Sequence, residues 1–218
     1  MRLSRPTTPQ LVALVIALCL LAGIVGWRVG RGFPPSAGSP EVGFVHDMIS
    51  HHEQAIVMSQ IELANGTERG VRVFADEIMR FQSYEIGLLE RFLEEWGHSR
   101  YDVPDDAMAW MGDPVARDAM PGLADDDEMQ SLRDAGGDTD AWFVALMVDH
   151  HAGGVAMIDG VLDHASGDLL ELATRMRKAQ ASEIGELLAA AERAGLDVPP
   201  AGATWDVYGG DGEHAHGG

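Results

Sequence analysis

The sequence predicts an all-α protein in which two similar helical hairpins form a four-helix bundle behind an N-terminal apolar helix. Three observations predict this fold. Aromatic residues make up only 6 % of the 218 residues, and Ala, Leu, Met and Glu are common, a composition that favours helices over sheets. The chain after residue 40 carries long stretches of helical periodicity. The chain also repeats a motif at a spacing of 99 residues.

Residues 1–31 are predicted to be a signal anchor or a signal peptide. The uncharged run 11–27 follows Arg2 and Arg5, and as a helix it would reach about 26 Å, slightly less than a bilayer core. No small-x-small cleavage site follows it, and Trp27–Arg28 resembles an interfacial border, so the anchor is favoured over the cleaved peptide. Both alternatives place the rest of the chain outside the cytoplasm, on a single-pass anchor or secreted.

The bounds of the remaining elements are predicted from helix-capping and helix-breaking residues. Residues 32–40 are rich in Pro, Gly and Ser and predict a linker. The bundle is expected over 41–195, with hairpins at 41–97 and 138–195 and a crossover at 98–137, and with a disordered tail at 196–218. The expected helices are 41–64, 68–96 (with Thr67 as N-cap), a short one near 125–134, 139–165 and 168–194.

The internal repeat is the strongest feature of the chain. A shift of 99 residues superposes five positions of the first hairpin on the second, and a shift of 98 superposes three more. The pairs are Phe44/Phe143, Met48/Met147, His51/His150, His52/His151, Met58/Met157, Gln82/Gln180, Glu85/Glu183 and Ile86/Ile184. Because each hairpin has one apolar stripe, we expect the two to close on each other with pseudo-twofold symmetry.

Charge and cysteine content exclude several classes of function. All 35 acidic residues lie from Glu41 onward, whereas four of the 15 basic residues lie before it, so the part after residue 40 carries a formal charge of −24. Such a domain repels nucleic acid and attracts cations. Cys19, the single cysteine, lies in the apolar N-terminal run, which excludes thiolate zinc and iron–sulfur sites from the bundle.

The adjacent histidines are predicted to have different positions. On a helical wheel, His52 and His151 fall within the apolar stripes and point inward. His51 and His150 lie about 100° away, on a flank that they share with Met58 and Met157 respectively, and are expected at the edge of the bundle.

Four polar residues also fall within apolar stripes: Gln82, Glu85, Gln180 and Glu183. Unpartnered buried carboxylates are costly, so these groups must bond to one another, to water or to a metal. Three interpretations stay open. They form a satisfied polar layer with the inward histidines, they ligate a metal directly, or they orient a ligand histidine from a second shell.

Imidazole and thioether together suit copper better than they suit hard cations. The candidate metal ligands are Met48, His51, His52, Met58, Met147, His150, His151 and Met157. Weaker candidates are His46 and Asp149, the crossover methionines Met108, Met111 and Met120, and the His214-x-His216 pair of the tail.

These motifs resemble the family called domain of unknown function 305. The resemblance rests on the doubled segments from Phe44 to Met58 and from Phe143 to Met157, each followed by Gln-x-x-Glu-Ile, and on the crossover residues 120–124. It implies a ferritin-like four-helix bundle, usually exported, with some members linked to copper binding. The pair Gly153–Gly154 inside the third long helix departs from the family pattern.

The sequence therefore predicts a non-enzymatic, membrane-anchored copper-binding protein outside the cytoplasm, which sequesters the metal or passes it to an unidentified partner. Two alternatives stay open. One is a structural or interaction bundle with a polar core and no metal. The other is a ferritin-like di-metal oxidase that uses Glu85, Glu183, His52 and His151.

Overall fold

The computed structural model describes residues 7–30 and 34–200 and divides the chain into two compact units, Met1–Pro35 and Ser36–Gly218. The first unit holds α1 (Thr8–Gly30), whose side chains from residue 8 to residue 26 are all exposed. This helix is long and apolar enough to cross a membrane, and an N-terminal signal sequence has the same properties. Arg2, Arg5 and the side chains of Trp27 and Arg28, on which the anchor prediction drew, lie outside the described residues.

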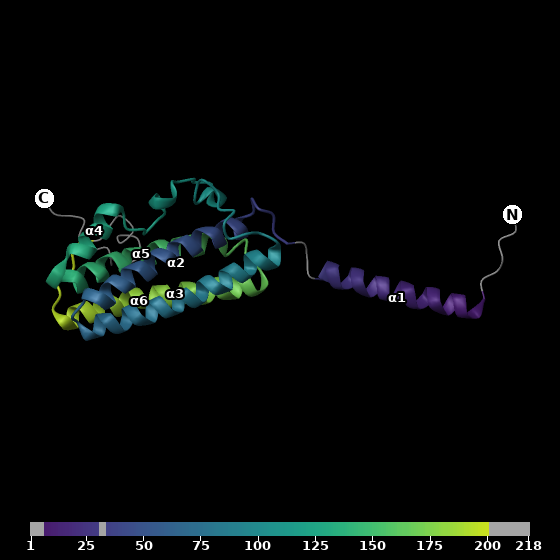
Figure 1. Cartoon of the computed structure of the whole chain (residues 1–218), viewed down its shortest axis with the longest axis horizontal. Coiled ribbons are helices and arrows are strands. Elements are labelled where there is room, and N and C mark those ends of the chain that lie inside the picture. Colours follow the sequence, from purple (N-terminus) through teal and green to yellow (C-terminus); the bar gives the residue numbers. More distant parts are fainter. Residues whose placement is uncertain (1–6, 31–33, 201–218) are drawn as a thin grey trace. The chain divides into compact units, whose positions relative to one another are not determined.

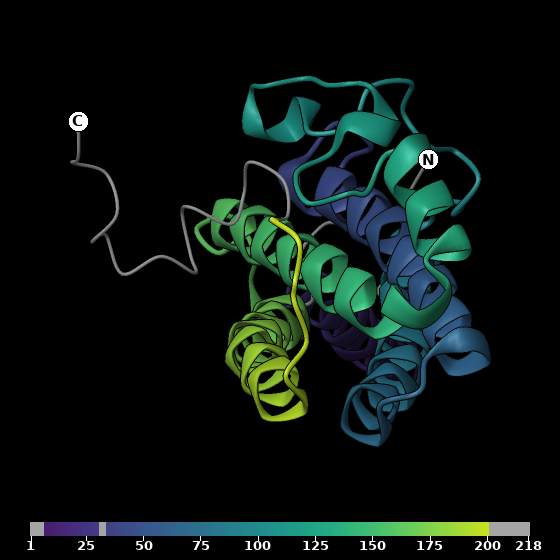
Figure 2. The same cartoon turned by 90° about the vertical axis from the view of Figure 1, so that its left-hand side faces the viewer.

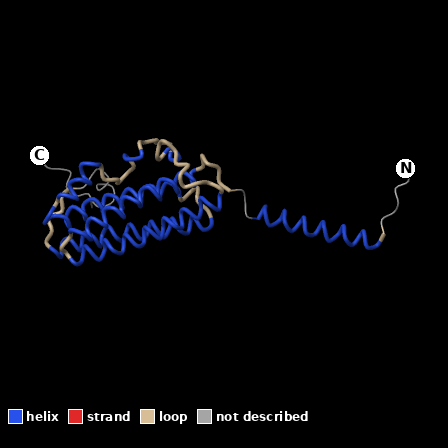
Figure 3. The backbone as a smooth tube through the Cα atoms, viewed as in Figure 1, coloured by secondary structure: helices blue, strands red, loops and turns tan. Residues whose placement is uncertain are grey.

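The second unit is a bundle of four long helices, as Figure 1 shows. These are α2 (Pro40–Asn65), α3 (Arg69–Trp96), α5 (Thr139–Val161) and α6 (Gly167–Ala194). α2 packs on α3 and α5 packs on α6, and the two hairpins meet mainly through α2 and α5. Within the described residues the tube of Figure 3 is helix and loop only. The predicted all-α four-helix bundle is confirmed.

The helix ends follow local chemistry. α2 begins where the Ser39 hydroxyl accepts a hydrogen bond from the Val42 amide, with Pro40 in the first turn. α3 and α6 end at Gly97 and Gly195, both in the left-handed region. The prediction of Thr67 as N-cap was wrong. Glu68 holds that position, and the amide and hydroxyl of Thr67 donate to Asp140 of α5 instead.

The crossover contains more local structure than the sequence predicted. Its helix α4 (Asp126–Asp134) starts with a capping box between Asp125 and Glu128. Three 3-10 turns accompany it: η1 (Ala109–Met111), η2 (Arg117–Ala119) and η3 (Gly136–Asp138). The end-on view of Figure 2 shows the crossover lying over α2 and α5, on the side away from α3 and α6.

α5 is the most deeply buried helix, because α2, α6 and the crossover cover it. Its segment is apolar enough to pass for a membrane span, but 89 % of that segment is buried inside the bundle. The helix predicted over 139–165 ends at Val161 and is followed by a turn before α6.

The unusual pair Gly153–Gly154 has a packing reason. A Cβ added at Gly153 would lie 2.1 Å from the carbonyl oxygen of Pro121, and one added at Gly154 would lie 2.2 Å from Oε1 of Gln180. Glycine at these two positions lets the crossover and α6 approach the α5 backbone.

Candidate metal centre

His51 of α2 and His150 of α5 meet at the crossing of their helices. Their ring centroids are 3.7 Å apart with an interplanar angle of 37°, and both side chains are completely buried. The Nε2–H of His150 donates to the backbone carbonyl of His51 over 2.8 Å. The Nε2–H of His51 donates to the carbonyl of Pro121 in the crossover over 3.1 Å. The repeat therefore brings its two copies into direct contact.

The prediction that His51 and His150 lie at the edge of the bundle was wrong. The flank on which they lie faces the other hairpin and the crossover instead of solvent. A helical wheel describes one isolated helix, so it cannot show what a long connection covers.

The inward prediction for His52 and His151 is confirmed, since both are completely buried. Nε2 of His52 lies 2.8 Å from Oε2 of Glu85, and Nε2 of His151 lies 2.6 Å from Oε2 of Glu183. Each hairpin thus contains one histidine–carboxylate pair. The interpretation in which Glu85 and Glu183 are partners of the inward histidines predicted these two pairs.

All four histidines leave the same nitrogen without a partner. Backbone carbonyls and ionised carboxylates only accept hydrogen bonds, so each ring must carry its proton on Nε2 to make the contacts above. In the neutral ring Nδ1 then keeps a free lone pair. Nδ1 of His51, His52, His150 and His151 is buried and has no hydrogen-bond partner.

The central histidines are held in the neutral form by their surroundings. Burial, followed by the repulsion of His52, lowers the pKa of His51 to about 3. Burial and the neighbouring His51 likewise lower the pKa of His150 well below its usual value. A neutral imidazole is the form that ligates metals.

The four methionines of the repeat lie in the core of the bundle. Met48, Met58, Met147 and Met157 are all completely buried. Met48 of α2 shares one apolar cluster with Met157 of α5, and Met58 of α2 shares the other with Met147 of α5. The repeat thus places a methionine of α2 and a methionine of α5 in each of the two apolar clusters.

The interpretation of a satisfied polar layer required Gln82 and Gln180 to complete the hydrogen bonds of the inner layer. The structure does not show these bonds. Both side chains are 3 % exposed, and all four of their amide oxygen and nitrogen atoms lack a partner. Glu85 and Glu183 are more open, with side chains 17 % and 22 % exposed. The inner layer is therefore only partly satisfied.

The crossover is fixed over the histidine pair by residues that the motif analysis missed. The Gln54 side chain donates to the carbonyl of Ala124 and accepts from its amide, both over 2.8 Å. Asp47, which is 2 % exposed, accepts from the Met108 amide and from Trp110 Nε1 and pairs with Arg117. Pro121, whose carbonyl accepts from His51, could have been found from the sequence, because the family resemblance already included the crossover segment 120–124.

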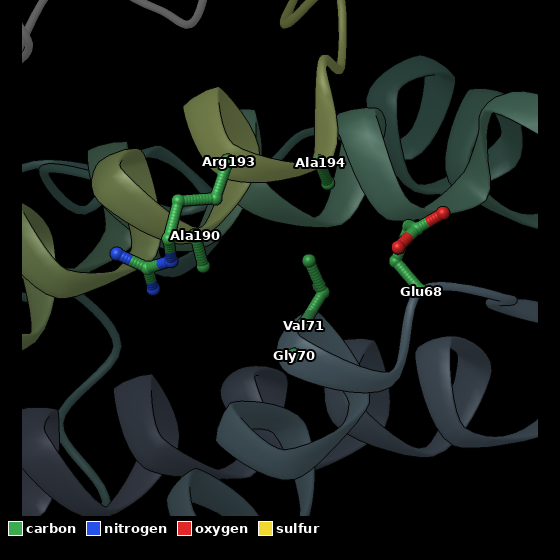
Figure 4. Close-up of a pocket in the computed structure, with 6 residues that line it drawn as sticks. All are labelled: Glu68, Gly70, Val71, Ala190, Arg193 and Ala194. Atoms are coloured by element: carbon green, nitrogen blue, oxygen red, sulfur yellow. The ribbon is translucent and has the colours of Figure 1, made fainter.

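Among the weaker candidates, Met108 and Met120 lie in the same apolar cluster as Met48 and Met157. His46, Asp149, Met108 and Met120 are buried, and Met111 is 43 % exposed. His214 and His216 lie outside the described residues. A separate pocket of about 180 Å³ between the start of α3 and the end of α6 contains none of the predicted ligands, as Figure 4 shows.

Donor chemistry limits what this centre can hold. Across residues 7–30 and 34–200 no three His, Cys, Asp or Glu side chains converge on one metal position. Among the described residues no carboxylate or further imidazole is therefore placed to complete the coordination of a metal at the histidine pair, and the buried methionines are the candidate sulfur ligands. Nitrogen and thioether ligands select soft or borderline ions.

The model of the family Domain of unknown function (DUF305) matches residues 41–191. A DUF305 protein from Streptomyces coelicolor has 32 % identity and a TM-score of 0.68, covering 75 % of this chain and 98 % of its own. A DUF305 fragment from Deinococcus radiodurans has 29 % identity and a TM-score of 0.61, covering 71 % and 96 %.

A third structure is CopM in its Cu(I)-bound form, with 20 % identity and a TM-score of 0.55, covering 72 % of this chain and 97 % of its own. At this identity the likeness shows a shared fold. No curated protein matches the chain.

Proposed function

The chain belongs to the DUF305 family, and we propose that it is a copper-binding protein which holds Cu(I) between its two hairpins. The proposed ligands are Nδ1 of the buried histidines and the thioethers of the four buried methionines of the repeat. The ligand set is Met48, His51, His52, Met58, Met147, His150, His151 and Met157.

The observation that carries this proposal is the common state of the four histidines. Metal-ligating histidines usually donate their second ring N–H to a carboxylate or a backbone carbonyl, which fixes the ring and its tautomer. Here Glu85, Glu183 and two backbone carbonyls supply that acceptor for all four rings. Four buried Nδ1 atoms without partners are a costly arrangement unless a ligand uses them.

Two further features favour copper over other metals. The thioethers of Met48, Met157, Met58 and Met147 are soft donors that Mg²⁺, Ca²⁺ and Mn²⁺ avoid. The low pKa of His51 and His150 also removes proton competition at neutral pH. CopM, which has the same fold, is known in Cu(I)-bound, Cu(II)-bound and Ag-bound forms.

We place this bundle outside the cytoplasm on a single-pass anchor, where it would sequester copper or hand it to a partner. α1 has the length and composition of a membrane span or a signal helix, and the Streptomyces relative is described as a secreted protein. The acidic bundle attracts cations and repels anionic partners.

Binding is favoured over catalysis by the geometry of the carboxylates. A ferritin-like di-metal oxidase needs several carboxylates and histidines around each metal. Glu85, Glu183, His52 and His151 form two separate pairs, and in the described part of the chain no three such side chains converge. The oxidase alternative predicts bound iron that is lost in Glu85→Ala.

The proposal is tested by anaerobic titration of the full-length protein in detergent with Cu(I) against a competing chromogenic chelator. His214 and His216 are replaced by Ala in every variant, so that the tail contributes no ligand. We expect competition at one or two equivalents and a loss of about tenfold or more in affinity for His51→Ala/His150→Ala.

The matched control is His164→Ala, which removes an exposed histidine in the turn after α5 and should leave Cu(I) affinity unchanged. Circular dichroism confirms that each variant keeps its helices. Equal affinity of the double variant and the control would reject the histidine pair as the site. An absence of any competition would favour the structural alternative with no metal.

A further inference from the structure

A second cavity lies between α3 and α6. It has a volume of about 110 Å³ and is lined by residues of the two Gln-x-x-Glu motifs together with three neighbours, namely Ile78, Phe81, Gln82, Glu85, Ala179, Gln180 and Glu183. In Figure 2 the α3–α6 side is the one that the crossover leaves uncovered. Neither His51 nor His150 lines this cavity.

The buried side-chain amides that line the cavity lack hydrogen-bond partners. Gln82 and Gln180 line it, both are 97 % buried, and none of their four polar side-chain atoms makes a hydrogen bond. Buried polar atoms are almost always satisfied in folded proteins, by protein, water or a ligand. Two glutamines from different helices with the same defect in the same cavity indicate a shared occupant.

α5 makes room for one of these amides. Oε1 of Gln180 lies 2.2 Å from the position that a Cβ of residue 154 would occupy, so the Gln180 side chain could not keep this rotamer beside any residue other than glycine. A mid-helix glycine is unfavourable by itself. Here it leaves room for the Gln180 amide against the α5 backbone.

The charges of the cavity are negative. Glu85 and Glu183 each use Oε2 to hold a histidine, which leaves Oε1 for another ligand. No lysine or arginine lines the cavity. Two carboxylates and two amide carbonyls form an oxygen donor set, and oxygen donors suit hard divalent cations.

We propose that this cavity binds a hard divalent cation such as Mn²⁺, Mg²⁺ or Ca²⁺, through carboxylate oxygens of Glu85 and Glu183 and amide oxygens of Gln82 and Gln180. Water completes the coordination, because the carboxylates and histidines of the described residues do not converge in threes. A volume of about 110 Å³ leaves room for the ion and a few waters. A soft ion is disfavoured, because no sulfur lines the cavity.

This second site does not depend on the copper proposal, although Glu85 and Glu183 connect the two proposed sites. Glu85 and Glu183 would bridge the cation on one side and the inward histidines on the other. The bundle would then hold a soft ion near the crossing of α2 and α5 and a hard ion between α3 and α6.

The test is Mn²⁺ binding by the full-length, copper-free protein in detergent, followed by electron paramagnetic resonance of free and bound Mn²⁺. We expect one tight equivalent. Glu85→Gln/Glu183→Gln keeps an acceptor for each histidine while it removes both charges, and it should weaken Mn²⁺ binding by about tenfold or more. Glu94→Gln/Glu192→Gln makes the same charge change at exposed positions of α3 and α6 and should bind Mn²⁺ normally.

Two further variants make the outcome specific. Gln82→Leu/Gln180→Leu should raise the melting temperature of the metal-free protein, because it removes unsatisfied amides, and should weaken Mn²⁺ binding. His51→Ala/His150→Ala should keep Mn²⁺ binding while it loses Cu(I) binding. The proposal is overturned if no Mn²⁺ binds at roughly millimolar concentration, if Glu85→Gln/Glu183→Gln and its control bind equally, or if loss of the central histidines abolishes Mn²⁺ binding.

Discussion

His51 and His150 occupy equivalent positions in the two copies of the repeat, 99 residues apart in the chain, and their imidazole rings lie 3.7 Å apart in the core. Their environments are equivalent only in part. His150 donates to the backbone of its twin, whereas His51 donates to Pro121 of the crossover. The connection between the hairpins is therefore part of the histidine centre.

Gly153→Ala should destabilise the bundle by about 2 kcal/mol, because the new methyl group would lie 2.1 Å from the carbonyl oxygen of Pro121 and 2.6 Å from the amide nitrogen of Gly122. Both neighbours are backbone atoms, which cannot rotate away. Urea denaturation measures the change in the free energy of unfolding.

Its control is Gly185→Ala in α6, where an added Cβ meets nothing within 4 Å. This substitution should stabilise the protein by about 1 kcal/mol through helix propensity alone. A Gly153→Ala variant as stable as the wild type would show that the crossover does not rest on α5 at this point.

Asp47→Ala should cost about 3 kcal/mol, because Asp47 accepts hydrogen bonds from Met108 and Trp110 and pairs with Arg117. Without it, the segment around η1 loses its hydrogen bonds to α2. Denaturation gives the energy, and limited proteolysis should show new cleavage in the crossover. Asp118→Ala, at an exposed position of the same crossover, should change neither result.

Glu62→Gln should make stability less dependent on pH. Burial, together with Asp140, raises the pKa of Glu62 from 4.5 to about 8. Between these values the unfolded chain loses the proton that the folded protein keeps, so the free energy of unfolding falls as pH rises. Each pKa unit corresponds to about 1.4 kcal/mol.

A glutamine at position 62 stays neutral, so the variant should be more stable than the wild type near the upper end of this window. Denaturation at several pH values from about 5 to 8 tests the slope, with Glu192→Gln at an exposed position as control. An unchanged slope in Glu62→Gln would mean that other groups cause the pH dependence.

Much of the fold could be predicted from the sequence, because the repeat and the helix caps are local signals. The shift of 99 residues identified Met48/Met147 and the two histidine pairs as equivalent positions, and the caps located the four long helices to within a few residues. The inward direction of His52 and His151 also followed from helical periodicity.

The covering of His51 and His150 could not be predicted in the same way. It depends on the path of the crossover, where Met108 adopts a left-handed conformation and Asp47 fixes the chain over long sequence separations. The Gly153–Gly154 pair was a signal of this covering. The reason for the two glycines is that Pro121 and Gln180 pack closely against these positions, which the sequence does not show.

Two-dimensional ¹H–¹⁵N NMR of the imidazoles during anaerobic Cu(I) addition tests whether Nδ1 of the buried histidines is the free ligand atom. We expect His51, His52, His150 and His151 to carry their proton on Nε2 in the metal-free protein. Nδ1 of His51 and His150 should shift with the first equivalents of Cu(I) while Nε2–H is retained. Protons on Nδ1 in the metal-free protein, or shifts confined to histidines outside these four, would contradict this assignment.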